Sequence, residues 1–583
     1  MLGRGSLLLV SLAALWTAAV LAVGVEGNFP LSDDWAYAHV VRSLCSGGGL
    51  DLLPWTGATL LAQVLYGWGA CKIAGFSYDV LRLTTLAASI AGVGAFFLVL
   101  RRLGARETTA TAGAALLAFS PLWFHLSFTF MTDVPFAAFG LVATALYLRG
   151  LQAPSRAALV AGSLAAAAAF LIRQHGLWIA MAAGLAALPA LQPRDSAPPR
   201  PAASRLADGV CAGALPLLVA CVWTLWAMLG SDVPQAVQNK VAETSLASGL
   251  VLADVAFRSL VTLGFLFLPW AVTARWSEPH ERRLFAAAML ALSATAAFAF
   301  FHNGATMFYL PNILHPRWIG ALTTRDAFFL RMPFEPTASS ALLCALTVAS
   351  VGSAAALLTR LAATTRGLWR ADANIRKPRL VLFALLALLL SWLGSLLQAH
   401  YYFDRYLMLI FPLAVACCVA GGSQARCGVA FATVLAAMTT FSVAGTHDYM
   451  EFHRARWDLL GALEAGGITA DEVDGGFEYN AERLAAELGT SPSDAQARPG
   501  QAPTVKSWWW VVDDEWIIAL GPLDGYVEEE RNQYPRWLAP GQGHVLALRR
   551  QDAPQARRAD DTSNAQSDRP HASGQPQPHG EEQ

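Results

Sequence analysis

Charged residues are scarce in this chain. Asp, Glu, Lys and Arg make up only 14% of its 583 residues, whereas hydrophobic types make up 55%. Soluble domains average about 25% charged residues, so a chain this long and this poor in charge cannot cover soluble domains with polar groups. The composition argues against a soluble enzyme, a disordered protein and a secreted disulfide scaffold. It indicates that lipid is the solvent for most of the chain.

Three further absences exclude other classes of protein. Lys and Arg (41) nearly balance Asp and Glu (42), so the net charge gives no sign of a nucleic-acid partner. Eight cysteines are too few for a disulfide framework, although Cys45 and Cys71 share one predicted loop and could either pair or stay free. No His/Cys cluster has the spacing of zinc ligands.

Long apolar runs recur over residues 1–446, and most are long enough to cross a hydrocarbon core roughly 30 Å thick. The first run follows Arg4 and could be a signal peptide, but so many similar runs follow that we interpret it as an uncleaved span. The predicted fold is mostly α, a polytopic membrane protein with about thirteen transmembrane helices. The predicted spans are 6–25, 80–100, 108–125, 134–149, 157–172, 177–191, 208–229, 256–273, 284–301, 339–358, 380–397, 406–421 and 427–445.

The basic residues predict how these spans are oriented. The loops on one side, such as 101–106 and 360–379, hold eighteen Lys and Arg residues, whereas the longer loops on the other side hold eight. By the positive-inside rule, the first set is cytoplasmic. The N-terminus is then inside, and the chain after about Thr446 is extracytoplasmic. The inner loops are short, so we expect any chemistry on the outer face.

The chain turns polar after the last span. Residues 447–550 are predicted to form a small extracytoplasmic α/β domain, with helices at 455–464 and 481–488 and strands at 508–520 and 544–548. The run Trp508-Trp509-Trp510 could be a carbohydrate platform, but a buried strand or packing at the membrane interface is favoured. Residues 551–583 lack large apolar side chains and are predicted to be a disordered tail.

Acidic residues stand at the outer ends of two spans. Asp33 and Asp34 follow the first span in Ser32-Asp33-Asp34-Trp35, and Asp133 begins the fourth in Thr132-Asp133-Val134-Pro135. Each could simply cap the helix that follows. Ionisable groups at membrane depth are nevertheless costly and usually mark a site, and both acidic segments lie on the same predicted face.

Arginines occur at the same outer level. Arg173 lies in the hairpin between the fifth and sixth predicted spans, and Arg405 lies between the eleventh and twelfth. Either could reach lipid headgroups, and Arg405 could pair with Asp404. An arginine can also hold a phosphate by two parallel hydrogen bonds. Acids beside arginines at one face suggest a site where a hydroxyl is deprotonated and a lipid phosphate leaves.

These motifs give the chain a resemblance to a known family. It resembles the polyprenyl-phosphate-dependent glycosyltransferases of the GT-C fold (glycosyltransferase family 39), near the protein O-mannosyltransferases and the lipid A aminoarabinose transferase. That family carries an acidic pair after the first span, a second acid often followed by Pro, and Arg-Tyr before a late span. Here Asp33-Asp34, Asp133 with Pro135, and Arg405-Tyr406 match. The segment Asp474-Gly475-Gly476-Phe477-Glu478-Tyr479-Asn480 is similar to one in bacterial relatives.

Two departures narrow what the resemblance implies. The first motif is Asp-Asp where the family usually has Asp-Glu. The aminoarabinose branch has a Lys-Pro-Pro segment in the first outer loop, whereas this chain reads Leu53-Pro54-Trp55-Thr56-Gly57. Without that Lys, the aminoarabinose substrate is in doubt. The cation would then have to come from Arg173, Lys72 or Arg405.

The resemblance implies transfer of a sugar from a polyprenyl-phosphate donor to an acceptor hydroxyl, with inversion, at a plasma (inner) membrane. We expect Asp33 to act as general base. Asp34 would bind sugar or acceptor or hold a loop, and Asp133 would orient the acceptor or share the base role. Arg405, and less directly Arg173 or Lys72, would stabilise the leaving phosphate. The acceptor could be a protein, a glycolipid or a cell-wall glycan.

Other functions are compatible with parts of this pattern. A transporter or flippase would need charges within spans or two related halves with broken helices, and the sequence shows neither clearly. In a non-catalytic assembly protein, the boundary acids would be helix caps. Nothing in the sequence demands a metal, but the three aspartates could hold a divalent cation if they converge.

Overall fold

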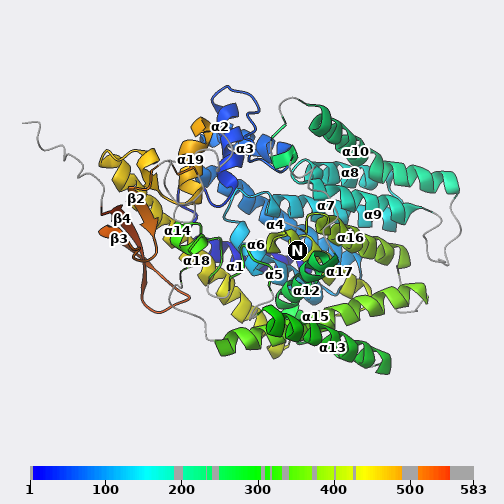
Figure 1. Ribbon diagram of the computed structural model, residues 1–583. Helices are drawn as coiled ribbons and strands as arrows, with labels where there is room; N and C mark the ends of the chain where they lie inside the picture. The colour runs from blue at the N-terminus through cyan, green and yellow to red at the C-terminus, as the bar shows by residue number, and fades with distance from the viewer. Residues whose placement is uncertain are drawn as a thin grey trace, which may run out of the picture.

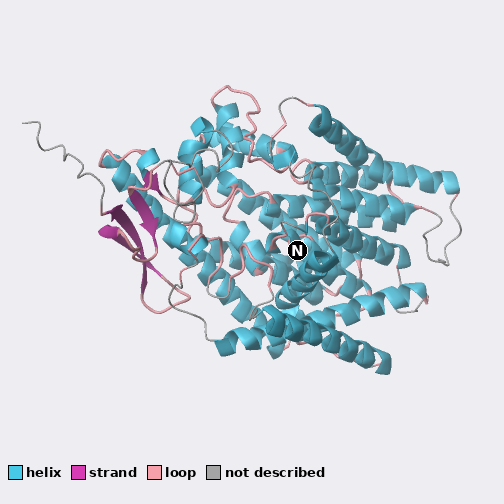
Figure 2. Ribbon diagram, viewed as in Figure 1, coloured by secondary structure: helices cyan, strands magenta, loops and turns pink. Residues whose placement is uncertain are grey.

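The computed structural model describes residues 4–188, 201–230, 233–234, 236–238, 249–276, 278–303, 309–315, 318–330, 332, 340–370, 377–399, 402–424, 428–488, 510–511 and 513–551. Helices form most of this part of the chain, and a small sheet lies at one end of the molecule, at the left in Figure 1 (see also Figure 2). The predicted fold class, a mostly helical chain with a small C-terminal sheet, is confirmed.

Every predicted span falls on a helix of the structure. The helices concerned are α1 (Arg4–Val23), α4 (Tyr78–Arg102), α5 (Glu107–Ala118), α7 (Asp133–Gln152), α8 (Arg156–Phe170), α9 (Leu177–Ala187), α10 (Ala202–Leu229), α12 (Gly249–Ala271), α13 (Pro279–Asn303), α15 (Ser340–Trp369), α16 (Pro378–Leu396), α17 (Ile410–Ala420) and α18 (Val429–Ala465). The shorter helices are α2 (Asp34–Cys45), α3 (Leu61–Ala74), α6 (Pro121–Leu126), α14 (Arg325–Phe328) and α19 (Phe477–Leu488), with 3-10 turns η1 (Gln174–Gly176), η4 (Asp404–Leu407) and η5 (Ala470–Glu472).

The positions of the helices do not by themselves give the number of membrane crossings. In the described residues, eight helices are long and apolar enough to cross a membrane, and two shorter apolar helices accompany them. The span predicted at 108–125 is interrupted, because α5 ends at Ala118 and α6 begins at Pro121. A multi-pass protein is therefore confirmed, whereas thirteen crossings remain a prediction.

Burial separates the inner helices from those that face outward. In α7, 78% of the most apolar stretch is buried, because α4 and α8 pack on it. In α13 only 11% is buried, although this helix is equally free of charge in its middle. Large apolar surfaces left open on a protein mark contact with another apolar phase. The exposed faces of helices such as α13 and α10 are therefore the lipid-facing surface.

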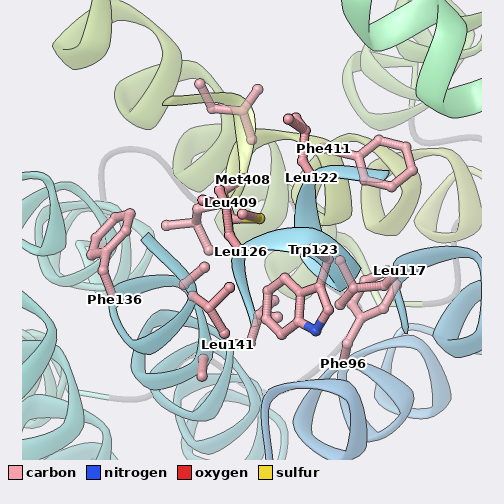
Figure 3. Close-up of a cluster of buried hydrophobic side chains, with 14 of the residues drawn as sticks. Phe96, Leu117, Leu122, Trp123, Leu126, Phe136, Leu141, Met408, Leu409 and Phe411 are labelled. Carbon is pink, nitrogen blue, oxygen red and sulfur yellow. The ribbon is translucent and has the colours of Figure 1, made fainter. Parts of the chain in front are cut away.

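A core of large side chains joins segments that are far apart in the sequence. Trp123 of α6 is fully buried and donates its indole N–H to the Ser89 hydroxyl of α4 at 2.7 Å. Figure 3 shows Trp123 among Phe96 of α4, Leu141 of α7 and Leu409 near the start of α17. This packing joins α4, α6 and α7 to the start of α17, and the candidate site lies near the first residues of α7 and α17.

Contacts between loops agree with the predicted two-sided arrangement. On one side, the Lys377 ammonium donates to the Arg102 carbonyl at 2.9 Å, and the Gln424 amide donates to the Gly104 carbonyl at 3.4 Å. All four residues belong to loops that were predicted to be cytoplasmic. On the other side, the backbone N–H of Leu60, in the first predicted outer loop, donates at 3.2 Å to the carbonyl of Ile172, the last residue of the fifth predicted span.

The C-terminal region corrects part of the sequence analysis. The helix predicted at 455–464 is not separate, because α18 runs without a break from Val429 to Ala465. The predicted boundary at residues 446 and 447 therefore lies inside a helix, and the last span continues into the polar region. Of the Trp508–Trp510 run, Trp508 and Trp509 lie outside the described residues, as do residues 552–583 of the predicted tail.

The sheet has four strands in the order β1-β2-β4-β3. Strands β2 (Trp516–Ala519) and β4 (Gln542–Arg550) fall on the two predicted strands, whereas β1 (Val473–Asp474) and β3 (Tyr526–Pro535) were not predicted. β1 pairs parallel to β2, and the other pairs are antiparallel. β3 has no apolar sequence pattern that would predict a strand, because it is an exposed edge strand rich in Glu, Arg and Gln. Charged residues are common on edge strands.

A close contact between helices α12 and α15 gives a test of the packing. A Cβ at Gly264 of α12 would lie 2.1 Å from the backbone carbonyl oxygen of Ser350 in α15, so Gly264→Ala must force the two helices apart. We expect a loss of about 1–3 kcal/mol, as for other overpacked cores, measured as a lower Tm in detergent. Gly94→Ala in α4 meets open space and should leave Tm unchanged or slightly raised. Equal Tm values for the two variants would contradict the α12–α15 packing.

Candidate functional site

The structure brings together four of the charged residues that the sequence singled out. Asp33, Asp133, Arg173 and Arg405 come from four separate segments on the side predicted to be outer, and they form two ion pairs. Arg405 Nη2 lies 3.1 Å from Asp33 Oδ2, and Arg173 Nη1 lies 2.6 Å from Asp133 Oδ1. The electrostatic influence of Asp133 also reaches Arg405. The two pairs therefore form one charge cluster, which we call the acid–arginine cluster.

Asp33 is the carboxylate of the cluster that is open to solvent. Its side chain is 20% exposed, whereas that of Asp133 is fully buried. Asp33 Oδ1 accepts a hydrogen bond from the Trp55 indole N–H at 3.1 Å, and Oδ2 accepts from Arg405. The indole and the guanidinium hold the carboxylate from two sides and leave part of it accessible.

Asp133 and Arg173 make a more enclosed pair. Arg173 Nε donates to the Thr132 hydroxyl at 2.8 Å, and its guanidinium carbon lies 5.2 Å from the centre of the Tyr406 ring. The second oxygen of Asp133, Oδ2, is buried without a hydrogen-bond partner in the structure. A buried acceptor without a partner is costly, so this oxygen is available to a hydroxyl or other donor that enters the site.

Arg405 has more donors than the protein uses. Its side chain is 8% exposed, and Nε and Nη1 have no hydrogen-bond partner although both are buried. Burial alone would lower the pKa of Arg405, but the carboxylates of Asp133 and Asp33 outweigh it and raise the pKa. Arg405, Arg173 and Tyr406 line one small pocket. The pocket thus presents a permanent cation whose Nε and Nη1 atoms carry three unused N–H groups.

Neither acid of the cluster acts as a helix cap. Asp33 occupies the N-cap position of α2, yet its side chain accepts no capping hydrogen bond. Thr132 occupies the N-cap position of α7, also without a side-chain cap, and Asp133 is the first residue of that helix. The alternative that these acids only cap the following helices therefore does not hold for α2 and α7. Both carboxylates bind arginines instead.

Asp34 has a different environment from its neighbour. It is 2% exposed, and its two oxygens accept backbone N–H groups, from Leu31 at 2.6 Å and from Phe130 at 3.0 Å. Burial raises the pKa of Asp34 to about 7, against the opposing effect of these two hydrogen bonds. Of the roles expected for Asp34, this geometry corresponds to holding a loop, because it ties the segment before α2 to the segment before α7.

The structure does not bring Lys72 into the cluster. Its ammonium is exposed, donates to the Cys45 carbonyl at 3.4 Å and lies 5.9 Å from the centre of the Trp68 ring. Arg405 does not use the expected alternative partner either, because Asp404 Oδ2 accepts the backbone N–H groups of Ile313 and Leu314. Cys45 and Cys71, the other open question of the first outer loop, are both free thiols.

The three aspartates do not converge on one point that a cation could fill. Asp34 faces backbone N–H groups, and Asp33 and Asp133 each face an arginine. Within the described parts of the chain, no group of three or more His, Cys, Asp or Glu side chains could hold a metal ion.

Several residues that build the site were not among the candidates predicted from the sequence. Tyr37 of α2 is buried where the charges of Asp33, Asp133, Arg173 and Arg405 all act on its phenol; burial and Asp33 raise its pKa. It lies four residues after Asp33, one helical turn away, and this spacing was the available signal.

Trp55, which holds Asp33, belongs to a cluster of four aromatic rings. The other members are Trp35, Phe477 and Trp510, and the ring centres lie between 5.4 and 6.4 Å apart. Trp510 is fully buried there, which fits the favoured interpretation of that residue as a packing side chain. Because Phe477 and Trp510 come from the C-terminal region, this region packs directly behind Asp33.

A larger cavity lies apart from the acid–arginine cluster. It has a volume of about 400 Å³ and lies between α18, the segment around Trp318 and the C-terminal sheet. Its wall carries Tyr449, Tyr534 and His544 but none of the four charged residues of the cluster. The small pocket at Arg405 is therefore the candidate site for the chemistry, although it is not the largest space in the protein.

A family comparison agrees with the resemblance that the motifs predicted. The model of the dolichyl-phosphate-mannose-protein mannosyltransferase family matches residues 65–194. This segment contains Asp133 and Arg173, whereas Asp33, Asp34 and Arg405 lie outside it. The predicted similarity to lipid-phosphate-dependent glycosyltransferases is confirmed over this segment. The comparison with curated proteins gave no match.

Solved structures of three glycosyl-transferring membrane proteins are similar to the chain at low identity. ArnT from Cupriavidus metallidurans in the apo state is 15% identical with a TM-score of 0.37, over 92% of this chain and 98% of that chain. The archaeal oligosaccharyltransferase AglB from Archaeoglobus fulgidus is 13% identical with a TM-score of 0.38, over 76% of this chain. The chain spans about half, 54%, of the length of AglB.

The third is the arabinosyltransferase EmbB from Mycobacterium smegmatis. It is 13% identical with a TM-score of 0.31, over 76% of this chain and 41% of that chain. Similarity at this level does not assign an activity, so the function has to be argued from the site.

The pKa of Asp34 predicts how stability depends on pH. Because its folded-state pKa is about 7, above the ordinary 3.8, the folded protein holds this proton more tightly than the unfolded chain does. The resulting stabilisation is complete below about pH 4, is lost as the pH rises towards 7, and changes little above that. We expect the Tm of the wild type, relative to that of Asp34→Asn, to fall between pH 4.5 and 7. A difference that grew over this range would contradict the buried, protonated Asp34.

Proposed function

We propose that this chain is a membrane glycosyltransferase that moves a sugar from a polyprenyl-phosphate donor to an acceptor hydroxyl on the outer face, with inversion. The single observation that carries the proposal is the state of Arg405. It is a buried guanidinium whose Nε and Nη1 atoms, with three N–H groups between them, have no partner, and it lies beside a partly exposed carboxylate. The mannosyltransferase-family match over residues 65–194 supports the same reaction class.

The unused donors of Arg405 fit a phosphate better than a neutral ligand. A guanidinium presents planar pairs of N–H groups that match two phosphate oxygens, and charge-assisted bonds of this kind are strong. In the proposed reaction the bond between the anomeric carbon and the phosphate oxygen breaks, and negative charge develops on the departing polyprenyl phosphate. Arg405 stabilises that charge as it forms. Its permanent positive charge suits this role at any working pH.

Asp33 is placed to accept the proton from the attacking hydroxyl. The acceptor oxygen attacks the anomeric carbon on the face opposite the phosphate, and its proton passes to the Asp33 carboxylate. The exposure of Asp33 gives an acceptor access, while the Trp55 indole keeps one oxygen in a fixed direction.

The remaining predicted site residues divide into two roles. The free Oδ2 of Asp133 accepts a hydrogen bond from the acceptor or the sugar, while Arg173 balances its charge. Asp34 maintains the loops that carry Asp33 and Asp133 and does not touch the reactants. The Lys72 ammonium contacts the Cys45 carbonyl and the Trp68 ring, so we assign it no role in transfer.

The proposal includes a location for the reaction. The donor's lipid tail stays in the bilayer, so its phosphate must reach Arg405 at the membrane boundary. The distribution of basic loops supports a multi-pass plasma (inner) membrane protein with a cytoplasmic N-terminus and an extracytoplasmic C-terminal region. The acceptor is a protein, a glycolipid or a cell-wall glycan. The four residues of the acid–arginine cluster all come from one predicted side of the membrane, and the mannosyltransferase-family match gives no support to the transporter alternative.

The base assignment predicts a graded loss of activity. Asp33→Asn should lower transfer from a polyprenyl-phosphate sugar by about 10²–10⁴-fold, because an amide cannot accept the proton. Asp133→Asn should lower it less, since it removes an orienting contact. Asp51→Asn is the control, because Asp51 lies in the same outer loop and its carboxylate is 61% exposed. Transfer by purified Asp33→Asn at the wild-type rate would remove Asp33 from the mechanism.

The role of Arg405 is tested separately. Arg405→Ala should lower kcat by about 10²–10³-fold, as for the loss of other transition-state donors. Arg405→Lys keeps the charge but not the paired N–H groups, so it should recover only part of that loss. The measurement is single-turnover transfer with saturating donor. Full activity of Arg405→Ala would show that the phosphate leaves elsewhere.

A further inference from the structure

A buried glutamate of the C-terminal region contacts the backbone next to Asp33. Glu478 lies near the start of α19 and is 0% exposed. Its Oε1 accepts the backbone N–H of Ser32 at 3.2 Å, across 446 residues of sequence. Its Oε2 accepts from the Thr323 hydroxyl and from Arg456 Nη1, the latter at 2.9 Å. The proposed reaction does not use the Glu478 carboxylate, although this carboxylate binds the residue that precedes Asp33, the proposed base.

Ser32 has a backbone conformation that needs support. Its φ is +57°, in the left-handed region that residues other than glycine rarely adopt. Such a conformation is strained and persists only where the surroundings hold it. The hydrogen bond from Ser32 N–H to Glu478 is a contact of this kind. Without it, the backbone at Ser32 would relax and Asp33, the next residue, would change direction.

A second route connects the same region to Asp33. Phe477, the residue before Glu478, packs against the Trp55 ring with ring centres 5.6 Å apart, and Trp55 donates its indole N–H to Asp33. The start of α19 therefore acts on Asp33 through the backbone on one side and through a side-chain hydrogen bond on the other. Both contacts come from one turn of one helix.

We propose that Glu478 is a positioning residue that fixes the direction of the Asp33 carboxylate, so that the C-terminal region completes the site. This inference rests on the proposed function. A displacement of about 1 Å at a reacting group can lower a rate roughly 100-fold. Loss of the Glu478 contact should therefore act on kcat, whereas Arg405 and its pocket, and with them the KM for the donor, should change little.

The direct test is Glu478→Gln with a matched control on the same helix. Every partner of the Glu478 carboxylate is a donor, so an amide must point its NH₂ group at one of them. Glu482, one turn later, is likewise surrounded by donors, Arg42 and the Tyr78 hydroxyl. Glu482→Gln therefore damages the docking of α19 in a similar way without touching Ser32.

We expect Glu478→Gln to lower kcat by about 10–100-fold with KM for a polyprenyl-phosphate sugar within about threefold of the wild type. Glu482→Gln should keep most of kcat. Adding Ser32→Gly to Glu478→Gln should restore at least part of kcat, because glycine adopts positive φ without strain. A kcat loss that is equal in the two Gln variants, or that Ser32→Gly does not relieve, would overturn the inference.

Hydrogen exchange provides a readout that does not depend on activity. In Glu478→Gln, the amide of Ser32 should exchange at least tenfold faster than in the wild type, whereas in Glu482→Gln it should not. Unchanged exchange at Ser32 in folded Glu478→Gln would overturn the proposed contact even if the wild type transferred no sugar. If the wild type transfers no sugar but the Ser32 amide exchanges faster in Glu478→Gln, the glycosyltransferase proposal is refuted and the Glu478–Ser32 hydrogen bond is still supported.

Discussion

The site depends on an imbalance between donors and acceptors in a buried place. Arg405 carries five N–H donors and is almost enclosed, yet the protein pairs it with one oxygen of Asp33 and leaves Nε and Nη1 without a partner. Burying a charge is tolerated only where its hydrogen bonds are made. An incoming phosphate would supply the missing acceptors. The unused donors of Arg405 are thus the reason to expect an anion there.

The rest of the outer face supports this one pair. Asp34 ties the loop before α2 to the loop before α7, so the two carboxylate-bearing segments move together. Asp404 ties the segment that carries Arg405 to residues 313 and 314. Glu478 and the aromatic cluster close the site from the C-terminal side. Three buried carboxylates therefore hold loops, and this leaves Asp33 and Asp133 for the ligand.

The sequence predicted the helices well because their signal is local. Long apolar runs need no knowledge of distant residues, and every predicted span lies on a helix. The same local patterns located Asp33, Asp133, Arg173 and Arg405. The local patterns could not show which contacts each side chain makes with residues far away in the sequence. Asp34 and Asp33 are adjacent and chemically identical in sequence, and only the fold shows that one faces backbone N–H groups and the other an arginine. Helix α18 continues past Thr446 because packing against the C-terminal sheet replaces contact with lipid, which a hydropathy pattern cannot show.

The central claim is that the unused donors of Arg405 bind the phosphate of a lipid-linked sugar beside Asp33. The most direct measurement is a cryo-EM structure of the full chain in lipid nanodiscs with a polyprenyl phosphate. The account predicts phosphate density within about 2.7–3.2 Å of the Arg405 guanidinium, with Asp33 facing the same pocket and the lipid tail leaving between helices into the bilayer. Phosphate density bound away from Arg405, with that guanidinium still unpartnered, would contradict it.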